Sequence, residues 1–173
     1  MTIKHAHVTR LNFLLAVGAL VAISETAHAD TITISGTACQ ASLGRQVLDI
    51  DRTGGTVANT NTLAQRSVTC PIPFSPLIAS PNPTLFVDGV NGPGATISCT
   101  VTMMRPDGTT FPQQDFSESN PASATANRPW RHSVTFAIGP GASASAYAFM
   151  DCILPAANDR GPRAVIVGVT SLQ

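Results

Sequence analysis

The sequence predicts an all-β protein, specifically an antiparallel β-sandwich of about seven to eight strands held by two disulfides. Three observations support this. Short stretches of alternating apolar and polar residues are separated by Gly- and Pro-rich turns, no convincing helical periodicity follows residue 29, and the cysteine count is four. Residues 30–173 have the length of a single domain with a sizeable core.

The N-terminus has the pattern of a secretory signal peptide. Lys4 and Arg10 precede an apolar stretch over residues 11–23, and the following segment, residues 24–29, ends in Ala27-His28-Ala29, a small-x-small cleavage site. This stretch of thirteen residues falls short of the roughly 20 needed to span a bilayer. We therefore expect residues 1–29 to be removed, leaving an exported protein that is periplasmic or extracellular and has no stable membrane anchor.

Charge restricts the classes of partner. Residues 30–173 contain no lysine, eight arginines, eight aspartates and one glutamate, which gives a net charge of −1. Nucleic-acid binding and polybasic membrane attachment both need a positive surface, so neither is expected. Charged residues make up only 12% of the whole chain, and Thr, Ser and small residues replace them. A neutral, hydroxyl-rich surface suits contact with a glycan or another protein.

Four cysteines follow the leader: Cys39, Cys70, Cys99 and Cys152. An even number in an oxidising compartment predicts disulfides, and four cysteines allow three pairings. Their order along the chain favours Cys39 with Cys70 and Cys99 with Cys152. Zinc is disfavoured because no two cysteines have metal-ligand spacing and only one histidine follows the leader.

The first half of the domain alternates weakly. Residues 31–35 are expected to form a strand rich in β-branched side chains, and residues 46–51 a weaker one. Residues 54–65 are expected to form a loop, and residues 67–70 a short strand ended by prolines. Residues 85–87 are expected to run into a turn over Asp88-Gly89-Val90-Asn91-Gly92.

The second half contains the clearest strand, residues 95–104. Its apolar residues face one way, together with Cys99, and its threonines and serine face the other way. A turn at 105–108 and a long polar segment at 109–129, with a short strand near Phe111, are expected next. The remaining strands are expected at 132–138, 145–154 and 163–170, the last with Val165, Val167 and Val169 on one face.

The strand at 145–154 bears on the disulfide pairing. Ala148, Met150, Cys152 and Leu154 share one of its faces. Cys99 and Cys152 are therefore both expected to point into the core, which supports joining them.

Possible ligand-binding residues are the two large aromatic side chains with polar tips and the neighbours of one of them. Trp130 and Tyr147 have faces on which a sugar ring can stack, and Arg131 and His132 follow Trp130 directly. The alternative is that both aromatic rings simply pack the sandwich.

Signals for catalysis or metal binding are weak. His132 could act with Asp151 or Asp115 and a serine, but no Gly-x-Ser-x-Gly motif is present. Asp49 and Asp51 would share a strand face as a carboxylate pair, as they also would on a solvated surface. The 88–92 segment lacks the alternating acidic ligands of a calcium loop. We assign no catalytic residue, metal ligand or cofactor.

Several short motifs carry a family resemblance. They are an early Cys39, Val68-Thr69-Cys70-Pro71, Val87-Asp88-Gly89, Ile97-Ser98-Cys99-Thr100, Trp130 and Cys152-Ile153-Leu154-Pro155. The chain resembles a loose group of small exported bacterial proteins, most of uncharacterised function. This resemblance implies a disulfide-bonded sandwich and brings no catalytic residues.

A second resemblance is to fimbrial subunits of the chaperone–usher type, which complete one another by adding a strand. Residues 31–35 would then be the donor strand, although the chain lacks a near-terminal Tyr and has two cysteine pairs instead of one. The expected function is non-enzymatic binding or surface interaction with an unknown partner. The alternatives are a fimbria-like assembly subunit and a secreted hydrolase using His132 or the Asp49/Asp51 pair.

Overall fold

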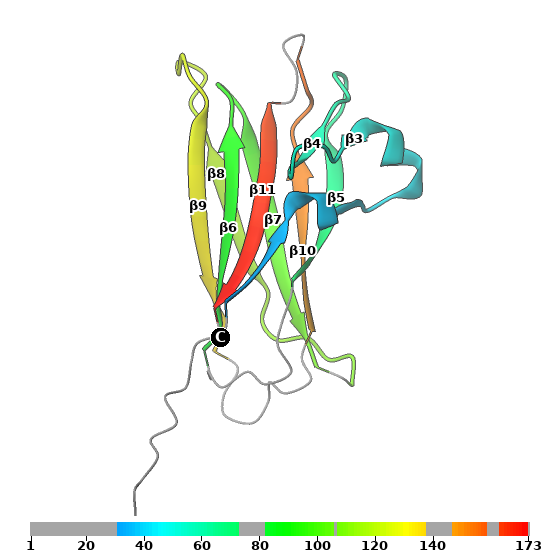
Figure 1. Ribbon diagram of the computed structural model, residues 1–173, viewed down its shortest axis with the longest axis vertical. Helices are drawn as coiled ribbons and strands as arrows, with labels where there is room; N and C mark the ends of the chain where they lie inside the picture. Colours follow the sequence, from blue (N-terminus) through cyan, green and yellow to red (C-terminus); the bar gives the residue numbers. More distant parts are fainter. Residues whose placement is uncertain (1–30, 73–81, 106, 138–146, 159–162, 173) are drawn as a thin grey trace, which may run out of the picture.

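The computed structural model describes residues 31–72, 82–105, 107–137, 147–158 and 163–172. The predicted signal peptide lies outside these residues. They form two antiparallel β-sheets packed face to face, as the sequence predicts (Figure 1). Across the described ranges, no helix has the length and apolarity needed to cross a membrane.

The first sheet has six strands in the order β3-β4-β11-β6-β9, with β1 also paired to β11. These strands are β1 (Thr31–Ser35), β3 (Ile50–Asp51), β4 (Val57–Asn59), β6 (Thr84–Asn91), β9 (Arg128–Thr135) and β11 (Ala164–Leu172). Strands distant in sequence lie side by side, so the sheet is built from long-range pairings.

The second sheet has five strands in the order β2-β5-β10-β7-β8. They are β2 (Gln40–Ala41), β5 (Arg66–Ile72), β7 (Thr96–Met104), β8 (Gln114–Ser119) and β10 (Tyr147–Leu154). Two 3-10 helices flank β2: η1 (Gly36–Ala38) precedes it and η2 (Gly44–Asp49) follows it. The chain crosses from the second sheet to the first through η2.

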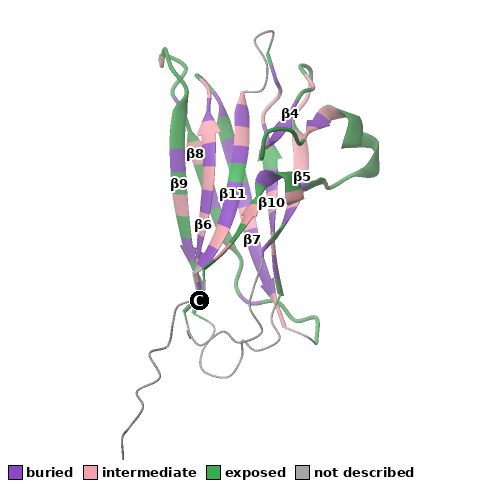
Figure 2. Ribbon diagram, in the orientation of Figure 1, coloured by how far each residue is buried: buried purple, intermediate pink, exposed green. Residues whose placement is uncertain are grey.

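The core lies between the sheets and follows the alternation of the strands. Buried and less buried residues succeed one another along β6, β7, β9 and β10 (Figure 2). Leu85 and Ile166 from one sheet and Ile97 and Met150 from the other are fully buried. In β7 and β10 the buried faces are those expected from the sequence, which confirms the predicted orientation of both cysteines.

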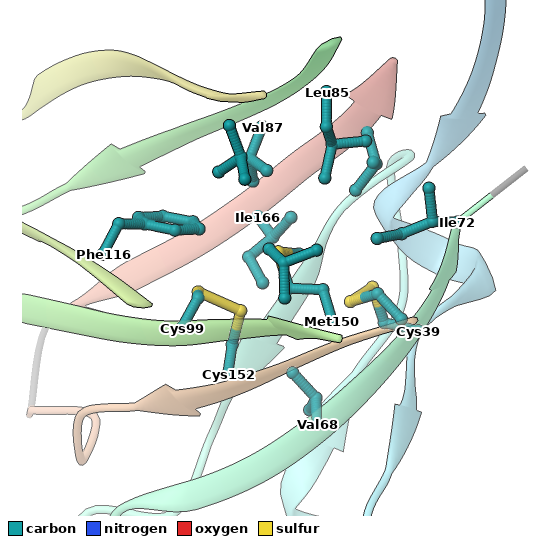
Figure 3. Close-up of a cluster of buried hydrophobic side chains, with 14 of the residues drawn as sticks. Cys39, Val68, Ile72, Leu85, Val87, Cys99, Phe116, Met150, Cys152 and Ile166 are labelled. Carbon is teal, nitrogen blue, oxygen red and sulfur yellow. A yellow bond between two sulfur atoms is a disulfide. The ribbon is translucent and has the colours of Figure 1, made fainter. Parts of the chain in front are cut away.

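Both predicted disulfides are present, joining Cys39 to Cys70 and Cys99 to Cys152. Cys99 and Cys152 are register partners on the adjacent strands β7 and β10, and their side chains enter the core beside Phe116 (Figure 3). Cys39 lies at the end of η1 and ties the N-terminal segment to β5.

The described residues form eleven strands, more than the seven to eight expected, mainly because β2, β3 and β4 are only two or three residues long. Residues 46–51 are not a continuous strand, since Gly44–Asp49 forms the 3-10 helix η2 and only Ile50–Asp51 is extended. The strand expected near Phe111 is β8, which begins at Gln114. β3 pairs with β4 and β8 with β7, so these strands depend on a partner segment as well as on their own alternation.

Two further expectations are corrected in the first sheet. Residues 88–92 are not a turn, because β6 continues to Asn91 and pairs with β9 throughout. In β11 a bulge between Ile166 and Gly168 changes the alternation. Ile166 and Val169 therefore face the core, while Val167 faces outward.

The N-terminal strand β1 bears on the fimbrial alternative. All five of its residues pair with β11 of the same chain, from Thr31 opposite Leu172 to Ser35 opposite Gly168. A donor strand must be free to complete a neighbouring subunit. Because β1 already completes its own sheet, the structure does not support strand donation by residues 31–35.

Candidate functional site

The four residues expected to bind a ligand do not form one site. Trp130, Arg131 and His132 lie on β9 at the edge of the six-stranded sheet, whereas Tyr147 begins β10 in the other sheet. Trp130 is only 8% exposed and packs edge-on against Phe116. Its ring belongs to the core and offers no open face for stacking.

Arg131 points outward from β9 and makes a two-pronged ion pair with Asp88, at 2.6 and 3.0 Å. This contact holds the pKa of the Arg131 guanidinium above its ordinary value, through the hydrogen bond first and the carboxylate charge second. Asp88 is therefore a structural partner on the neighbouring strand β6 and not part of a calcium loop.

His132 points inward and links the edges of the two sheets. Its ring stacks on Phe116 with centroids 4.2 Å apart, and its Nδ1 lies 2.9 Å from Glu118 Oε1 on β8. Among the described residues it has no hydrogen bond to Asp115, Asp151 or a serine hydroxyl. The arrangement closes the edge of the sandwich, and the catalytic triad considered as an alternative does not assemble among the described residues.

Asp49 and Asp51 do not act as a pair either. Asp49 ends η2 and accepts a 2.7 Å hydrogen bond from Arg66 Nε. Asp51 instead accepts hydrogen bonds from the backbone and hydroxyl of Thr53 in the following turn. The two carboxylates are committed to different local contacts.

The Asp49–Arg66 contact yields a pH prediction. The hydrogen bond from Arg66, together with one from Asn61, holds the pKa of Asp49 below its usual 3.8. A lowered pKa means that the contact stabilises the fold above about pH 3.8 and is lost as the pH falls through the lowered value. We expect Arg66→Gln to raise the pKa of Asp49 towards 3.8 in an NMR titration.

Asp107 is the internal reference for that titration. Hydrogen bonds from the side chain and backbone of Thr109 lower the pKa of Asp107, and Arg66 is not among the causes. Its titration should be unchanged in the Arg66→Gln protein. An unchanged pKa of Asp49 in the Arg66→Gln protein would show that Arg66 does not lower that pKa.

A further candidate site is on the second sheet, on the face that points away from the core. An open groove of about 840 Å³ crosses β5, β10, β7 and β8 there, and we call it the outer groove. Five hydroxyl side chains line it, along with two carboxylates, Asp115 and Asp151, and the apolar side chain of Ile153. The hydroxyls are those of Ser42, Ser67, Ser98, Thr100 and Ser117.

Hydroxyl groups hold both carboxylates of the outer groove. Thr69 Oγ1 donates to Asp151 Oδ1 at 2.5 Å, and Thr100 Oγ1 donates to Asp115 Oδ1 at 2.6 Å. Ser42 Oγ lies 3.0 Å from Thr69 Oγ1. Since a hydroxyl has a single hydrogen and Thr69 gives its own to Asp151, Ser42 is the donor in this pair. The polar groups are thus oriented before any ligand arrives.

Strand register places these groups in two rows that run across the sheet. In the first row Thr69, Asp151, Thr100 and Asp115 are successive register partners. The second row lies two residues further along each strand. It contains Ser67, Ile153, Ser98 and Ser117. A ligand lying across the strands therefore meets a polar group at each strand, except above Ile153.

Tyr147 is the one expected binding residue on this face. It is 50% exposed and, with Phe149, Asp151 and Ile153, occupies the outward positions of β10. It does not line the outer groove itself but lies beyond it along the same strand. The described residues contain no cluster of three or more His, Cys, Asp or Glu suited to a metal ion.

Comparisons with known proteins give no family. No protein-family model matches the sequence, and no curated protein matches it. Solved structures with a similar outline include the C-terminal CBM6 of a marine laminarinase from Zobellia galactanivorans. It is 16% identical, with a TM-score of 0.44, and the match covers 83% of this chain and 100% of that one.

Two further matches are of the same kind. Tailspike protein 4 of bacteriophage CBA120 is 11% identical with a TM-score of 0.46, and the match covers 85% of this chain but 20% of the tailspike. A family 11 carbohydrate-binding module of a Clostridium thermocellum cellulase is 12% identical with a TM-score of 0.36, over 83% of this chain and 86% of that one. All three TM-scores are below 0.5, so none of these matches serves to describe the fold of this chain.

Proposed function

We propose that this protein is an exported, non-enzymatic binding protein that holds a glycan in the outer groove. The observation that carries the proposal is the groove itself, with its row of oriented hydroxyl and carboxylate groups across four strands. Sugars present many hydroxyls that both donate and accept hydrogen bonds, and carboxylates and hydroxyls are suitable partners for them.

Export is supported by the leader pattern at residues 1–29 and by the two disulfides, which suit an oxidising compartment. A periplasmic or extracellular location follows from the same features. A low content of charged residues fits a surface that meets neutral, hydrated ligands.

Binding is favoured over hydrolysis by the contacts of the titratable groups. His132 is held by Phe116 and Glu118 at the sandwich edge, and it does not line the groove. Asp151 and Asp115 lie on β10 and β8 with β7 between them, and each is held by a threonine. No serine among the described residues is paired with a histidine as an activated nucleophile would be.

The test is to fill the groove with a large charged side chain. Ile153 lines the groove and is 42% exposed, so Ile153→Arg should fold and obstruct the ligand. The matched control is Val167→Arg, because Val167 is 41% exposed on the outward face of the opposite sheet. Affinity electrophoresis in gels containing β-glucan, xylan, galactomannan or chitosan would measure retardation.

We expect at least one of these polysaccharides to retard the wild-type protein and the Val167→Arg protein but not the Ile153→Arg protein. Equal retardation of both variants would place binding away from the outer groove. No retardation by any of the four would contradict glycan binding. The appearance of new reducing ends during incubation would show hydrolysis, which the proposal excludes.

A further inference from the structure

The charge of the outer groove points to a narrower class of ligand. Among the described residues the ion pairs are Arg66–Asp49, Arg131–Asp88 and His132–Glu118, and all three lie outside the groove. Asp115 and Asp151 line the groove, and no basic side chain lines it with them. Two negative charges are therefore neutralised by no neighbouring cation in the described part of the chain.

The two uncompensated carboxylates determine which chemical groups of a ligand bind favourably in the outer groove. A ligand that covers a carboxylate removes water from it, and a hydroxyl replaces that water without neutralising the charge. An ammonium group supplies both a hydrogen bond and the opposite charge. Asp151 is already half-buried in the centre of the sheet, so covering it with a neutral group is the less favourable choice. An anionic glycan is repelled by both carboxylates.

The spacing of the carboxylates suits an extended sugar chain. Neighbouring strands lie about 4.8 Å apart, so the main chains at Asp115 and Asp151 are about 10 Å apart across β7. A sugar ring in an extended polysaccharide is about as long as one strand spacing. A chain lying across the sheet can thus place one ring over each strand, with amines over the two aspartates and hydroxyls over Thr100 and the serines.

A basic peptide is the other cationic candidate, and the site suits it less well. Extended peptides bind sheets at open edges, where unpaired backbone groups are available. The outer groove lies on the face of the sheet, over β10 and β7, whose backbones are already paired on both sides. Five hydroxyl side chains line this one groove beside the two carboxylates, and a sugar chain, with hydroxyls on every ring, can use more of them than successive peptide side chains can.

We infer that the outer groove selects glycans carrying free amino groups, such as chains of glucosamine, with Asp115 and Asp151 as the acceptors of the sugar ammonium groups. This inference rests on the proposed function and specifies its ligand. It predicts a preference that depends on charge and that neutral or anionic polysaccharides do not share.

The experiment compares two oligosaccharides of equal length, a glucosamine hexamer and its N-acetylated counterpart, by calorimetry in mildly acidic buffer of low salt. We expect the amine-bearing hexamer to bind about tenfold more tightly, since two partly exposed ion pairs together give about this factor. The ratio of the two affinities, amine-bearing to acetylated hexamer, should approach one in the Asp115→Asn/Asp151→Asn protein. It should also fall in wild-type protein as salt is added, because salt screens exposed charges.

The control variant is Asp51→Asn/Asp107→Asn, which makes the same change in net charge outside the groove. Both of these aspartates accept hydrogen bonds within their own turns, a role that asparagine keeps through its side-chain oxygen. We expect this variant to retain the tenfold preference. Loss of the preference here would show that it reflects the overall charge of the protein and not the groove.

The outcomes separate the inference from the proposed function. If the acetylated hexamer binds as tightly as the amine-bearing one and Ile153→Arg abolishes both, the glycan site stands and the amine preference is wrong. If neither hexamer nor any of the four polysaccharides binds, the proposed function itself is wrong. If an oligolysine peptide binds with the same dependence on Asp115 and Asp151 while the sugars do not, the ligand is a basic peptide. If the Asp115→Asn/Asp151→Asn protein does not fold, the salt series in wild-type protein tests the amine preference instead. An affinity ratio that does not fall as salt is added would contradict it.

Discussion

Replacing Cys99 and Cys152 together by alanine is expected to lower the free energy of unfolding by about 4 kcal/mol. This disulfide closes a loop of 53 residues, and its loss restores that loop's freedom to the unfolded chain. Alanine is the appropriate replacement because both positions are almost fully buried, where a serine hydroxyl would lack a partner. Urea unfolding under oxidising conditions measures the difference.

The effect should extend to the outer groove. Cys99 and Cys152 are register partners on β7 and β10, and both contribute to the floor of the groove. Thr100 and Asp151 are their immediate neighbours in the chain, so the disulfide fixes the separation of two groove residues. We therefore expect glycan retardation to weaken even below the denaturation midpoint.

The matched control is the Cys39→Ala/Cys70→Ala protein. The Cys39–Cys70 disulfide closes a loop of 31 residues, so its removal should lower the free energy of unfolding by about half a kcal/mol less than removal of Cys99–Cys152. This disulfide lies outside the groove. Retardation should remain close to the wild-type value. If the Cys99→Ala/Cys152→Ala protein loses less than about 1 kcal/mol of unfolding free energy, the disulfide does not stabilise the fold as expected. Peptide mapping that joins Cys39 to Cys99 would contradict the disulfide pairing itself.

The Cys99–Cys152 pairing was predictable in part from local alternation, whereas the Cys39–Cys70 pairing was expected only from the order of the cysteines along the chain. A period of two places every second residue of β7 on one face, so Cys99 had to lie with Ile97 and Val101, and the same rule oriented Cys152 in β10. The outward hydroxyls of β7 followed from the same rule. Fold class, the inward orientation of Cys99 and Cys152, and one polar face are therefore properties of single segments.

The outer groove was not predictable because it depends on which strands are neighbours. Asp115 and Asp151 become part of one site only because β10 lies between β5 and β7, with β8 beyond β7. In the sequence they were considered only as alternative acidic partners of His132, and nothing brought them together in one site among the eight aspartates that follow the leader. The 3-10 helix η2 escaped prediction for a related reason. The chain crosses between sheets there, and Val47 and Leu48 remain exposed instead of alternating into a core.

The burial of Trp130 also depends on a partner from elsewhere in the chain. Gly89 on β6 is its register partner, and the indole ring lies directly over this glycine. Any other residue at position 89 would place a side chain in the space that the ring occupies. In the sequence alone, Gly89 indicated a turn. Only the strand register shows that this position lacks a side chain where the indole ring of Trp130 packs.

Gly89→Ala is accordingly expected to lower the free energy of unfolding by about 3 kcal/mol, at the upper end of the range for overpacked cores. An added Cβ would lie 2.1 Å from Trp130 Cζ2 and 2.5 Å from Cε2, so the ring must move. The ring is held by Phe116 on the opposite sheet, which leaves it little room. Because Trp130 is the only tryptophan, its fluorescence emission reports the displacement directly.

A double-mutant cycle isolates this clash. In a Trp130→Ala background the obstructing ring is gone, so Gly89→Ala should cost less than about 0.5 kcal/mol, since alanine is no worse than glycine inside a strand. The interaction energy should then be about 2.5 kcal/mol. Similar costs in both backgrounds would mean that the strand requires glycine for its backbone and not for the indole. A cost below about 1 kcal/mol in the wild-type background would show that Trp130 moves aside easily and does not fix the edge formed by β8 and β9.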